Sequence, residues 1–292
     1  MRQKDIVSQH IESLLITNHN IYITRIVLNK SKVRRLIVKK LVVLFIITLL
    51  ICSMPVMAAD LKDIKLGDFV TFGAYEQDND LDNGPEPIEW EVLDVQDGKA
   101  LLFSRYALDC QPYNVEFQET TWETCTLRTW LNEDFFGSAF DDLESELVVE
   151  TVIVNDDHPY YETEGGNNTN DRVFLLSLEE IGKYYGIGLD SDECEQPHDN
   201  LKCRLTEYGK ERFIPIWAQD FFDGSVERAE ERYQNGVESY GQNYCRMWWL
   251  RSIGSTDHYA ILIDEDGYIH WNGGDVDGAS SAVRPAIWIS TE

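Results

Sequence analysis

The chain has 292 residues, and its 52 acidic side chains outnumber its 25 basic ones, for a formal net charge of −27 at pH 7. A negative field of this size repels phosphate backbones and anionic lipids, so it excludes nucleic acid as a partner. All eight tryptophans lie beyond residue 89, and 43% of the chain is hydrophobic. The later part of the chain can therefore bury a core.

An export signal is predicted at residues 39–59. Two lysines precede an unbroken apolar run over residues 41–52, and residues 56–58 fit a small-x-small exit. A positive flank, an apolar core of about 7–15 residues and such an exit describe a cleaved signal peptide. We expect the mature chain to begin at Ala59 or Asp60, and the protein to be secreted or to lie on the extracellular side of the cell membrane.

Two other uses of this segment stay open. An uncleaved anchor needs about 20 apolar residues, a length that is reached only by including Ser53 and Pro55. Lipidation of Cys52 is disfavoured because Ile51 precedes it, where a small residue is usual. Residues 1–38 are either an atypical N-terminal extension or lie upstream of the true start.

Residues 60–292 are predicted to form a single globular domain. Residues 1–59 hold nine of the basic and two of the acidic side chains, so the remainder has 16 basic and 50 acidic side chains and a net charge of −34. Its length suits one domain, with an irregular insertion near residues 187–245. Contact with a membrane is expected only through the N-terminal segment.

In chain order, this domain is predicted to open as a β-meander. Residues 68–73 and 88–95 alternate between apolar and polar side chains, as strands with one buried face do. Asp97 and Gly98 predict a tight hairpin turn that leads to a partner strand over residues 100–105.

Helix signals follow the meander. Thr120 or Thr121 is expected to cap a helix that extends towards Asn132. A second short helix is expected over residues 139–149, with Phe140, Leu143 and Leu147 on one inner face.

Ser177 and Glu180 have the spacing of a capping box at the start of a third helix over residues 178–185. Residues 187–245 are the least regular stretch, with a charged helix predicted over residues 225–236.

The last part of the domain is again predicted to be β-structure, with strands at residues 247–252, 259–263, 268–271 and 282–290. The second and third of these flank an Asp-Gly turn at Asp266 and Gly267. Pro285 suits an edge or a bulge of the closing strand. Trp248 and Trp249 point to opposite faces of a strand, so at least one is expected in the core.

The mature part has five cysteines, and export permits disulfides. The pairs Cys110–Cys125 and Cys194–Cys203 are the first to test, with buried free thiols as the alternative. Catalysis by Cys245 is disfavoured because no base and no second cysteine lie near it in the sequence.

No cofactor is required by any motif, and calcium is a candidate. Asp264 and Asp275 each begin an Asp-x-Asp-Gly run, and calcium favours six to eight oxygen ligands. An EF-hand loop needs a glutamate at its twelfth position, where Asp275 and Ala286 stand instead. A hairpin turn is therefore favoured at Asp264, and calcium is considered only at Asp275.

Aromatic side chains stack on sugar rings, and Asn and Asp accept hydrogen bonds from hydroxyl groups. The segment at residues 271–275 combines both, so the predicted ligand-binding residues are Trp271, Asn272, Asp275, Asp277 and Arg251. The alternative is that Trp271 fills the sheet. Arg128, Arg251 and Arg284 lie inside apolar strings, and salt bridges are the favoured role of all three because a buried arginine is costly unless it is paired.

Several strings occur together in order: FGAYEQ at 72–77, PIEW at 87–90, LDCQPYN at 108–114, TWETCTLRTWLN at 121–132, WWLRS at 248–252 and VRPAIWI at 283–289. Together they resemble a bacterial family of domains of unknown function, number 6273, common in exported proteins of Gram-positive gut bacteria. The resemblance covers about residues 64–290. The architecture of the family is similar to C-type-lectin-like and formylglycine-generating-enzyme-like domains.

The resemblance implies an α+β, C-type-lectin-like fold, mainly of antiparallel strands with a few short helices. The expected role is non-catalytic binding of a glycan or an extracellular protein. The alternatives are an enzyme on a formylglycine-generating-enzyme-like scaffold and a structural module of a surface assembly. Fold analogy alone cannot choose between them.

Overall fold

The computed structural model describes residues 61–189, 196–240 and 244–292. The predicted export segment, the extension before it and Cys194 lie outside these ranges. Within the described part, no helix has the length and apolar character needed to cross a membrane. All described residues belong to one unit, Ala58–Glu292, and combine helices with two five-stranded, mainly antiparallel sheets. The fold class is therefore α+β, as predicted.

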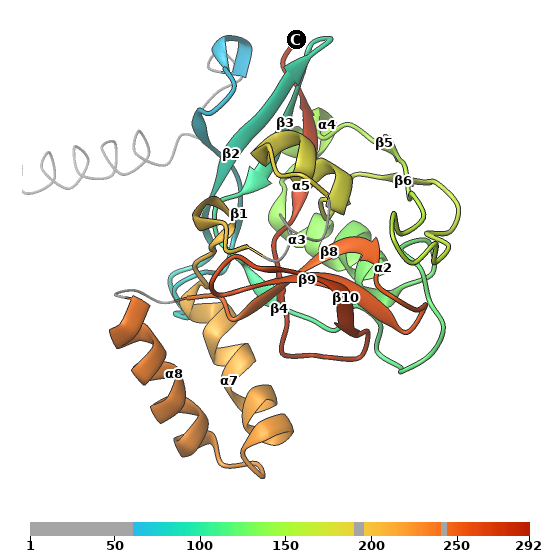
Figure 1. Cartoon of the computed structure of the whole chain (residues 1–292). Coiled ribbons are helices and arrows are strands. Elements are labelled where there is room, and N and C mark those ends of the chain that lie inside the picture. Colours follow the sequence, from blue (N-terminus) through green and yellow to red (C-terminus); the bar gives the residue numbers. More distant parts are fainter. Residues whose placement is uncertain (1–60, 190–195, 241–243) are drawn as a thin grey trace, which may run out of the picture. The chain divides into compact units, whose positions relative to one another are not determined.

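The first sheet has the strand order β1-β2-β3-β12-β7, and all neighbouring strands run antiparallel (Figure 1). Its strands are β1 (Phe69–Tyr75), β2 (Glu86–Gln96), β3 (Lys99–Ser104), β12 (Ala286–Ser290) and β7 (Val173–Phe174). Asp97 and Gly98, between β2 and β3, have φ angles of 49° and 69°. A type I′ turn requires positive values at both positions, so the predicted hairpin is confirmed.

The second sheet has the order β10-β9-β8-β11-β4. Its strands are β10 (Ile269–Asp275), β9 (Tyr259–Asp264), β8 (Met247–Ile253), β11 (Ala282–Val283) and β4 (Asp109–Cys110). β8 and β11 are parallel and the other neighbours are antiparallel. A separate antiparallel pair, β5 (Thr151–Ile153) and β6 (Thr169–Asp171), frames a long loop.

The expectation of one continuous strand over residues 282–290 is wrong, because the chain changes sheets in the middle of this segment. Pro285 has no backbone N–H to donate to a ladder, and its carbonyl accepts a hydrogen bond from the Ser104 amide at 2.9 Å. The chain leaves the second sheet after Val283 and enters the first at Ala286. This short crossing joins the two sheets.

The tryptophan pair of β8 is buried on both faces of the strand. Trp248 is 0% exposed and Trp249 is 1% exposed. Trp248 packs on Phe103 with ring centroids 5.8 Å apart, and Trp249 packs on Tyr113 at the same distance. The prediction that at least one of them lies in the core is confirmed, and β8 is covered on both sides.

Short helices lie between the strands: η1 (Leu61–Asp63), α2 (Thr126–Trp130), η2 (Leu131–Phe135), α3 (Phe136–Ala139), α4 (Asp142–Leu147), α5 (Leu178–Tyr185) and η3 (Asp199–Leu201). The capping box of Ser177 and Glu180 is confirmed. The predicted cap at Thr120 or Thr121 is wrong, because Cys125 caps α2. Leu143 is 73% exposed, so its predicted inner position is also wrong.

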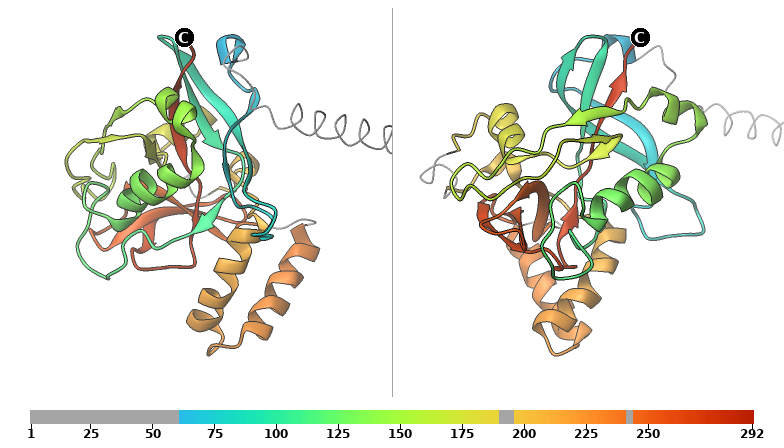
Figure 2. Two further views of the ribbon diagram at one scale, coloured as in Figure 1. Left: turned by 180° about the vertical axis from the view of Figure 1, so that it is seen from behind. Right: turned by 90° about the vertical axis from the view of Figure 1, so that its right-hand side faces the viewer.

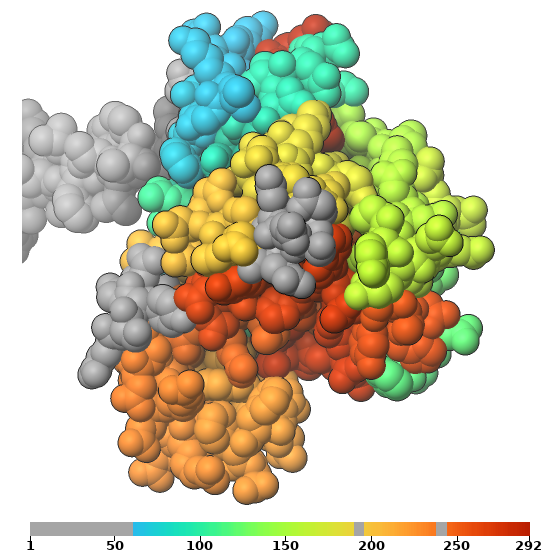
Figure 3. All heavy atoms as spheres, in the orientation of Figure 1, coloured from blue at the N-terminus to red at the C-terminus, as the bar shows by residue number. Residues whose placement is uncertain are grey.

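The predicted insertion contains a pair of helices, α7 (Glu207–Phe221) and α8 (Val226–Tyr240). Figure 2 shows them side by side, extending away from the second sheet, and Figure 3 shows their atoms as a separate lobe. The helix expected over residues 225–236 is confirmed. α7 escaped prediction because Pro215 lies inside it and Gly209 in its first turns, and both are poor helix formers. Phe213 stacks on Trp217 at 5.1 Å in the interior of the pair.

Two of the three arginines in apolar strings form the expected ion pairs, Arg128 with Asp171 and Arg251 with Glu180. Arg284 differs: it is 4% exposed, and no carboxylate of the described residues lies within ion-pair distance of it. Its guanidinium packs over the ring of Phe103, 4.0 Å from the centroid.

The bulge of β1 requires a glycine at position 73. Gly73 has a φ of +69°, and a Cβ there would lie 2.6 Å from the Ala139 carbonyl oxygen and 2.6 Å from the Phe140 ring. We expect Gly73→Ala to lower the free energy of unfolding by about 2–4 kcal/mol, from backbone strain and overpacking together. Gly67→Ala is the control, since Gly67 has a φ of +81° and open space around it. Equal losses in denaturant unfolding of the two variants would contradict this account.

Candidate functional site

Three aromatic side chains and a histidine form a cluster on one face of the domain. Tyr160, Tyr161 and His158 come from the loop between β5 and β6, and Trp271 comes from β10. Trp271 lies 6.1 Å from Tyr160 and 6.2 Å from His158 between ring centroids, and Tyr161 lies 4.9 Å from both Tyr160 and His158. We call these four residues the aromatic cluster.

His158 is the buried base of the aromatic cluster, with 2% exposure. Its Nδ1 lies 3.1 Å from the amide of Tyr160 and 3.2 Å from that of Tyr161, and its Nε2 lies 3.1 Å from the carbonyl oxygen of Trp271. Two N–H groups face Nδ1, so this nitrogen must accept and Nε2 must donate. Burial lowers the pKa of His158, so the neutral form with the proton on Nε2 fits this geometry.

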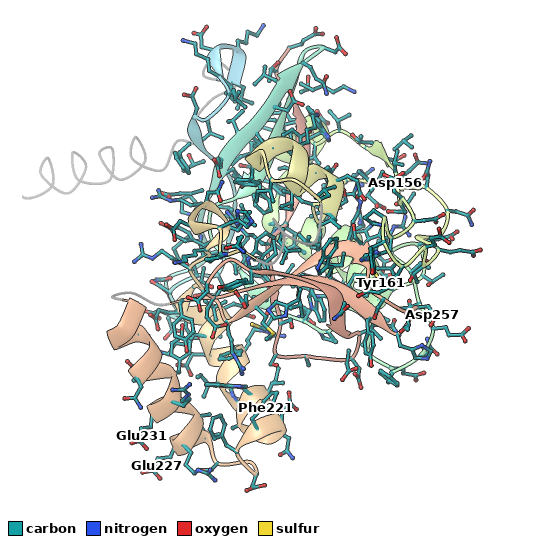
Figure 4. The ribbon with its side chains drawn as sticks, in the orientation of Figure 1. Asp156, Tyr161, Phe221, Glu227, Glu231 and Asp257 are labelled. Atoms are coloured by element: carbon teal, nitrogen blue, oxygen red, sulfur yellow. The ribbon has the colours of Figure 1, made fainter. Side chains whose placement is uncertain are left out.

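The outer surface of the aromatic cluster is open to solvent. Tyr160 is 70% exposed and Tyr161 is 40% exposed. The hydroxyl of Tyr161 donates to Oδ1 of Asn272, which is itself exposed. In Figure 3 the atoms of the β5–β6 loop, in yellow-green, adjoin those of the β8–β10 region in orange-red, and Figure 4 shows where Tyr161 lies.

Exposed acidic side chains of the same loop surround the aromatic cluster: Asp156, Asp157, Glu162 and Glu164. Asp157 accepts a hydrogen bond from the amide of Gly165 at 3.0 Å, which helps to hold the loop in shape. The local charge is therefore negative, in keeping with the chain as a whole. Such a rim disfavours anionic ligands.

A small pocket lies where this loop meets β8. Arg251, Asn155 and Asp156 are among the residues that line it. Arg251 Nε and Asn155 Oδ1 are buried without a hydrogen-bond partner, which is uncommon for buried polar atoms. The pocket has space for about one water molecule, which can pair with such buried polar atoms.

The structure brings two of the five predicted ligand-binding residues together. Trp271 and Asn272 lie in or beside the aromatic cluster, whereas Arg251 has a side chain that is only 4% exposed and lines the pocket. Asp275, at the end of β10, and Asp277 are exposed.

Asp277 belongs to a different part of the surface from the aromatic cluster. Burial and the charge of Asp277 raise the pKa of Asp220 in α7, so Asp277 lies near that helix. Trp271 is partly buried against the core and also contacts Tyr160, so both of its predicted roles have a structural counterpart.

The calcium candidate at Asp275 has no further ligands grouped with it. In the described ranges, the one group of three or more potential ligands whose side-chain atoms all lie within 4.8 Å of one another is Glu76, Asp78 and Glu86. Burial and the charge of Glu86 raise the pKa of Glu76, because its Oε1 is enclosed beside other carboxylates.

The first predicted disulfide, Cys110–Cys125, is not formed, and both cysteines are buried free thiols. The Cys110 thiol lies 3.6 Å from the Gly209 carbonyl oxygen, and the Cys125 thiol lies 3.4 Å from that of Trp122. The second pairing involves Cys194, which lies outside the described residues. No second cysteine lies near Cys245 in the sequence, but Cys203 is its neighbour in the folded structure.

Sequence reasoning missed Tyr160, Tyr161 and His158. These residues lie in a polar loop. The two adjacent tyrosines after Pro159 were the one sequence signal that could have indicated a binding site there. Tyr161 and Asn272 are 111 positions apart, so no local pattern could connect them.

We expect protonation of His158 to loosen the aromatic cluster. Its pKa in the folded state is lowered from the ordinary value of 6.5. Below that pH the unfolded chain takes up the proton first, so folding stability is lost as the pH falls. The melting temperature should therefore drop more in the wild type than in His158→Asn between about pH 7.5 and 5.5, because asparagine keeps an acceptor but does not titrate. Parallel losses in both proteins would contradict the prediction.

The comparisons with known proteins identify the family of this chain but give no information on a ligand. No curated protein and no solved structure matches the chain. A family described as a domain of unknown function (DUF6273) matches residues 97–291. The match contains the loop, the strand β10 and the aromatic cluster, while the strings at 72–77 and 87–90 lie before it. The chain belongs to the DUF6273 family.

Proposed function

We propose that this domain binds a neutral glycan on the aromatic cluster without catalysing a reaction. The observation that carries the proposal is the packing of the exposed Tyr160 against Trp271, which comes from a different element, with the exposed Tyr161 beside Tyr160. Exposed aromatic groups of this kind are costly to leave in water unless they serve a contact surface. Flat aromatic faces suit the C–H faces of sugar rings, and tyrosines lose little side-chain entropy on binding.

Polar groups around the aromatic cluster supply the hydrogen bonds that orient such a ligand. Asn272 is exposed beside the Tyr161 hydroxyl, and its side-chain amide nitrogen is a donor. Ligand sites combine mostly apolar surface with a few placed polar groups. The acidic rim favours a neutral sugar over a phosphorylated or carboxylated one.

A C-type-lectin-like or formylglycine-generating-enzyme-like architecture supports this proposal by analogy. An early meander, two short helical stretches and a final tryptophan-rich sheet occur in the order that such domains have. In that arrangement the segment around Trp271 would belong to the ligand face. The analogy concerns the fold, and the assignment of the ligand depends on the aromatic cluster itself.

The enzyme alternative finds less support. His258 pairs with Asp257 at 2.7 Å and His270 pairs with Asp264 at 2.8 Å, both at partly exposed positions. Neither ring is hydrogen-bonded to a hydroxyl or thiol of a described residue, which a base-activated nucleophile would need.

A glycan array tests the proposal directly. The protein should bind one or more neutral glycans, and Tyr160→Ala and Trp271→Ala should each weaken binding about 10-fold or more, the loss expected for a stacking contact of about 1–3 kcal/mol. Phe221→Ala is the matched control, since Phe221 is 63% exposed on α7, far from Tyr161 in Figure 4.

The array should be run with and without calcium, because Asp275 is the calcium candidate that the sequence offers. Melting temperatures of all variants would separate lost binding from lost folding. Failure to bind any glycan in either condition would overturn the glycan proposal. Binding of an extracellular protein that is weakened by Tyr160→Ala would assign the same surface to a protein partner.

We further propose that the domain is exported by the segment at residues 39–59. The charge and apolar pattern of that segment support this location, as does the acidity of residues 60–292. Mass spectrometry of the protein recovered from the medium should find a chain that begins at Ala59 or Asp60. A recovered chain that keeps residues 41–52 would contradict cleavage and support an anchor.

A further inference from the structure

Two buried thiols lie together at the base of the α7–α8 helix pair. The amide of Cys245 donates to the carbonyl oxygen of Cys203 at 3.0 Å, and the Cys203 and Cys245 thiols donate to the carbonyl oxygens of Arg204 and Met247, each at 3.3 Å. Cys203 is 5% exposed and Cys245 is 0% exposed. A disulfide joins residues whose Cα atoms lie about 4.4–6.8 Å apart, so the two residues must lie side by side, as this backbone hydrogen bond requires them to.

A buried cation lies close to these thiols. Arg284 donates through Nε to the Ser104 carbonyl oxygen at 2.8 Å, and its Nη1 is buried without a partner. Its charge acts on both Cys203 and Cys245. With no carboxylate among the described residues to pair with it, Arg284 stabilises negative charge nearby, since an uncompensated buried charge is costly.

The pKa values of the two thiols shift in opposite directions because each cysteine acts on the other. Burial opposes ionisation of Cys203, but the hydrogen bond from Cys245 and the charge of Arg284 lower its pKa to about 7. Burial and the neighbouring Cys203 raise the pKa of Cys245. One thiolate beside one thiol is the arrangement from which thiol–disulfide exchange begins.

A covalent link between Cys203 and Cys245 would enclose the α7–α8 helix pair, because the two residues flank it in the chain. Residues 204–244 contain both α7 and α8. α7 is also held to the domain by the ion pair of Arg212 with Asp109 in β4, by the Tyr208 amide, which donates to the Gln77 carbonyl oxygen at 3.1 Å, and by its buried face, which belongs to the core. A covalent bond between residues 203 and 245 would close the base of the whole helix pair.

We propose that Cys203 and Cys245 form a reversible disulfide that locks the α7–α8 pair onto the domain. The oxidant is a low-molecular-weight disulfide such as oxidised glutathione. The Cys203 thiolate attacks one of its sulfurs, which breaks the S–S bond, releases one thiolate and leaves a mixed disulfide. The Cys245 sulfur, after losing its proton, then attacks the Cys203 sulfur and expels the second thiolate. The net reaction oxidises two protein thiols and reduces one small disulfide to two thiols.

Two features of the site determine when the exchange occurs. Both sulfurs are enclosed, so exchange takes place while the helix pair folds or opens. Arg284 stabilises the reduced form through the Cys203 thiolate, and stabilisation of the reduced form makes a disulfide easier to reduce. The bond therefore responds to the redox environment.

The test uses protein purified after expression of the full chain. The protein is unfolded, refolded in glutathione buffers from reducing to oxidising, trapped with acid, alkylated and mapped by mass spectrometry. We expect a peptide pair linked through Cys203 and Cys245 whose amount rises with the proportion of oxidised glutathione. The oxidised form should melt roughly 5–10 °C above the reduced form, because the bond closes a loop of about 40 residues.

Matched variants assign the effect to this pair. Cys125→Ser removes a buried thiol elsewhere and should keep the oxidation-dependent melting shift, whereas Cys203→Ser and Cys245→Ser should each abolish it. Three results would overturn the proposal: Cys203 linked to Cys194 or Cys110 instead, both thiols alkylated in the most oxidising buffer, or a 203–245 bond that the most reducing buffer leaves intact.

Discussion

The buried guanidinium of Arg251 connects parts of the domain that are far apart in the sequence: strand β8, helix α5 and the start of the β5–β6 loop. Its Nη1 donates to the Leu175 carbonyl oxygen at 2.8 Å and to the carboxylate of Glu180, and its Nη2 donates to the Val154 carbonyl oxygen at 3.0 Å. The backbone carbonyl of the same residue accepts from the Tyr113 hydroxyl at 2.7 Å. A buried arginine is costly unless it is paired and hydrogen-bonded. Strand β8, helix α5 and the start of the β5–β6 loop are therefore held in one arrangement.

The position of that loop decides what the surface can offer. Val154 precedes the loop and is fixed by Arg251, and His158 then ties the two tyrosines to the backbone of Trp271. Two buried polar groups thus set the relative positions of side chains that are themselves exposed. A surface that is rigid before its ligand arrives loses less entropy on binding. Under the proposed function, the negative charge of the loop favours neutral sugars over anionic ones.

Sequence reasoning succeeded where the determining interaction is local. The Asp97-Gly98 turn and the Ser177 capping box need only neighbouring residues, and both were predicted. Sequence reasoning failed where contacts between residues far apart in the sequence determine the structure. Pro285 looked like a bulge in one strand, yet it marks a change of sheet. The partners in the aromatic cluster and in the Cys203–Cys245 pair are far apart along the chain, and only the packed fold brings them together.

The crossing at Pro285 has a consequence for the order in which the domain can assemble. β12 lies between β3 and β7, and β11 lies between β8 and β4, so residues 282–290 complete both sheets. They follow every other strand in the chain, and neither sheet can close before they are synthesised. A chain of this design stays incompletely folded during its synthesis. For the export proposed above, such late closure would keep the chain in a state that a translocation channel can accept.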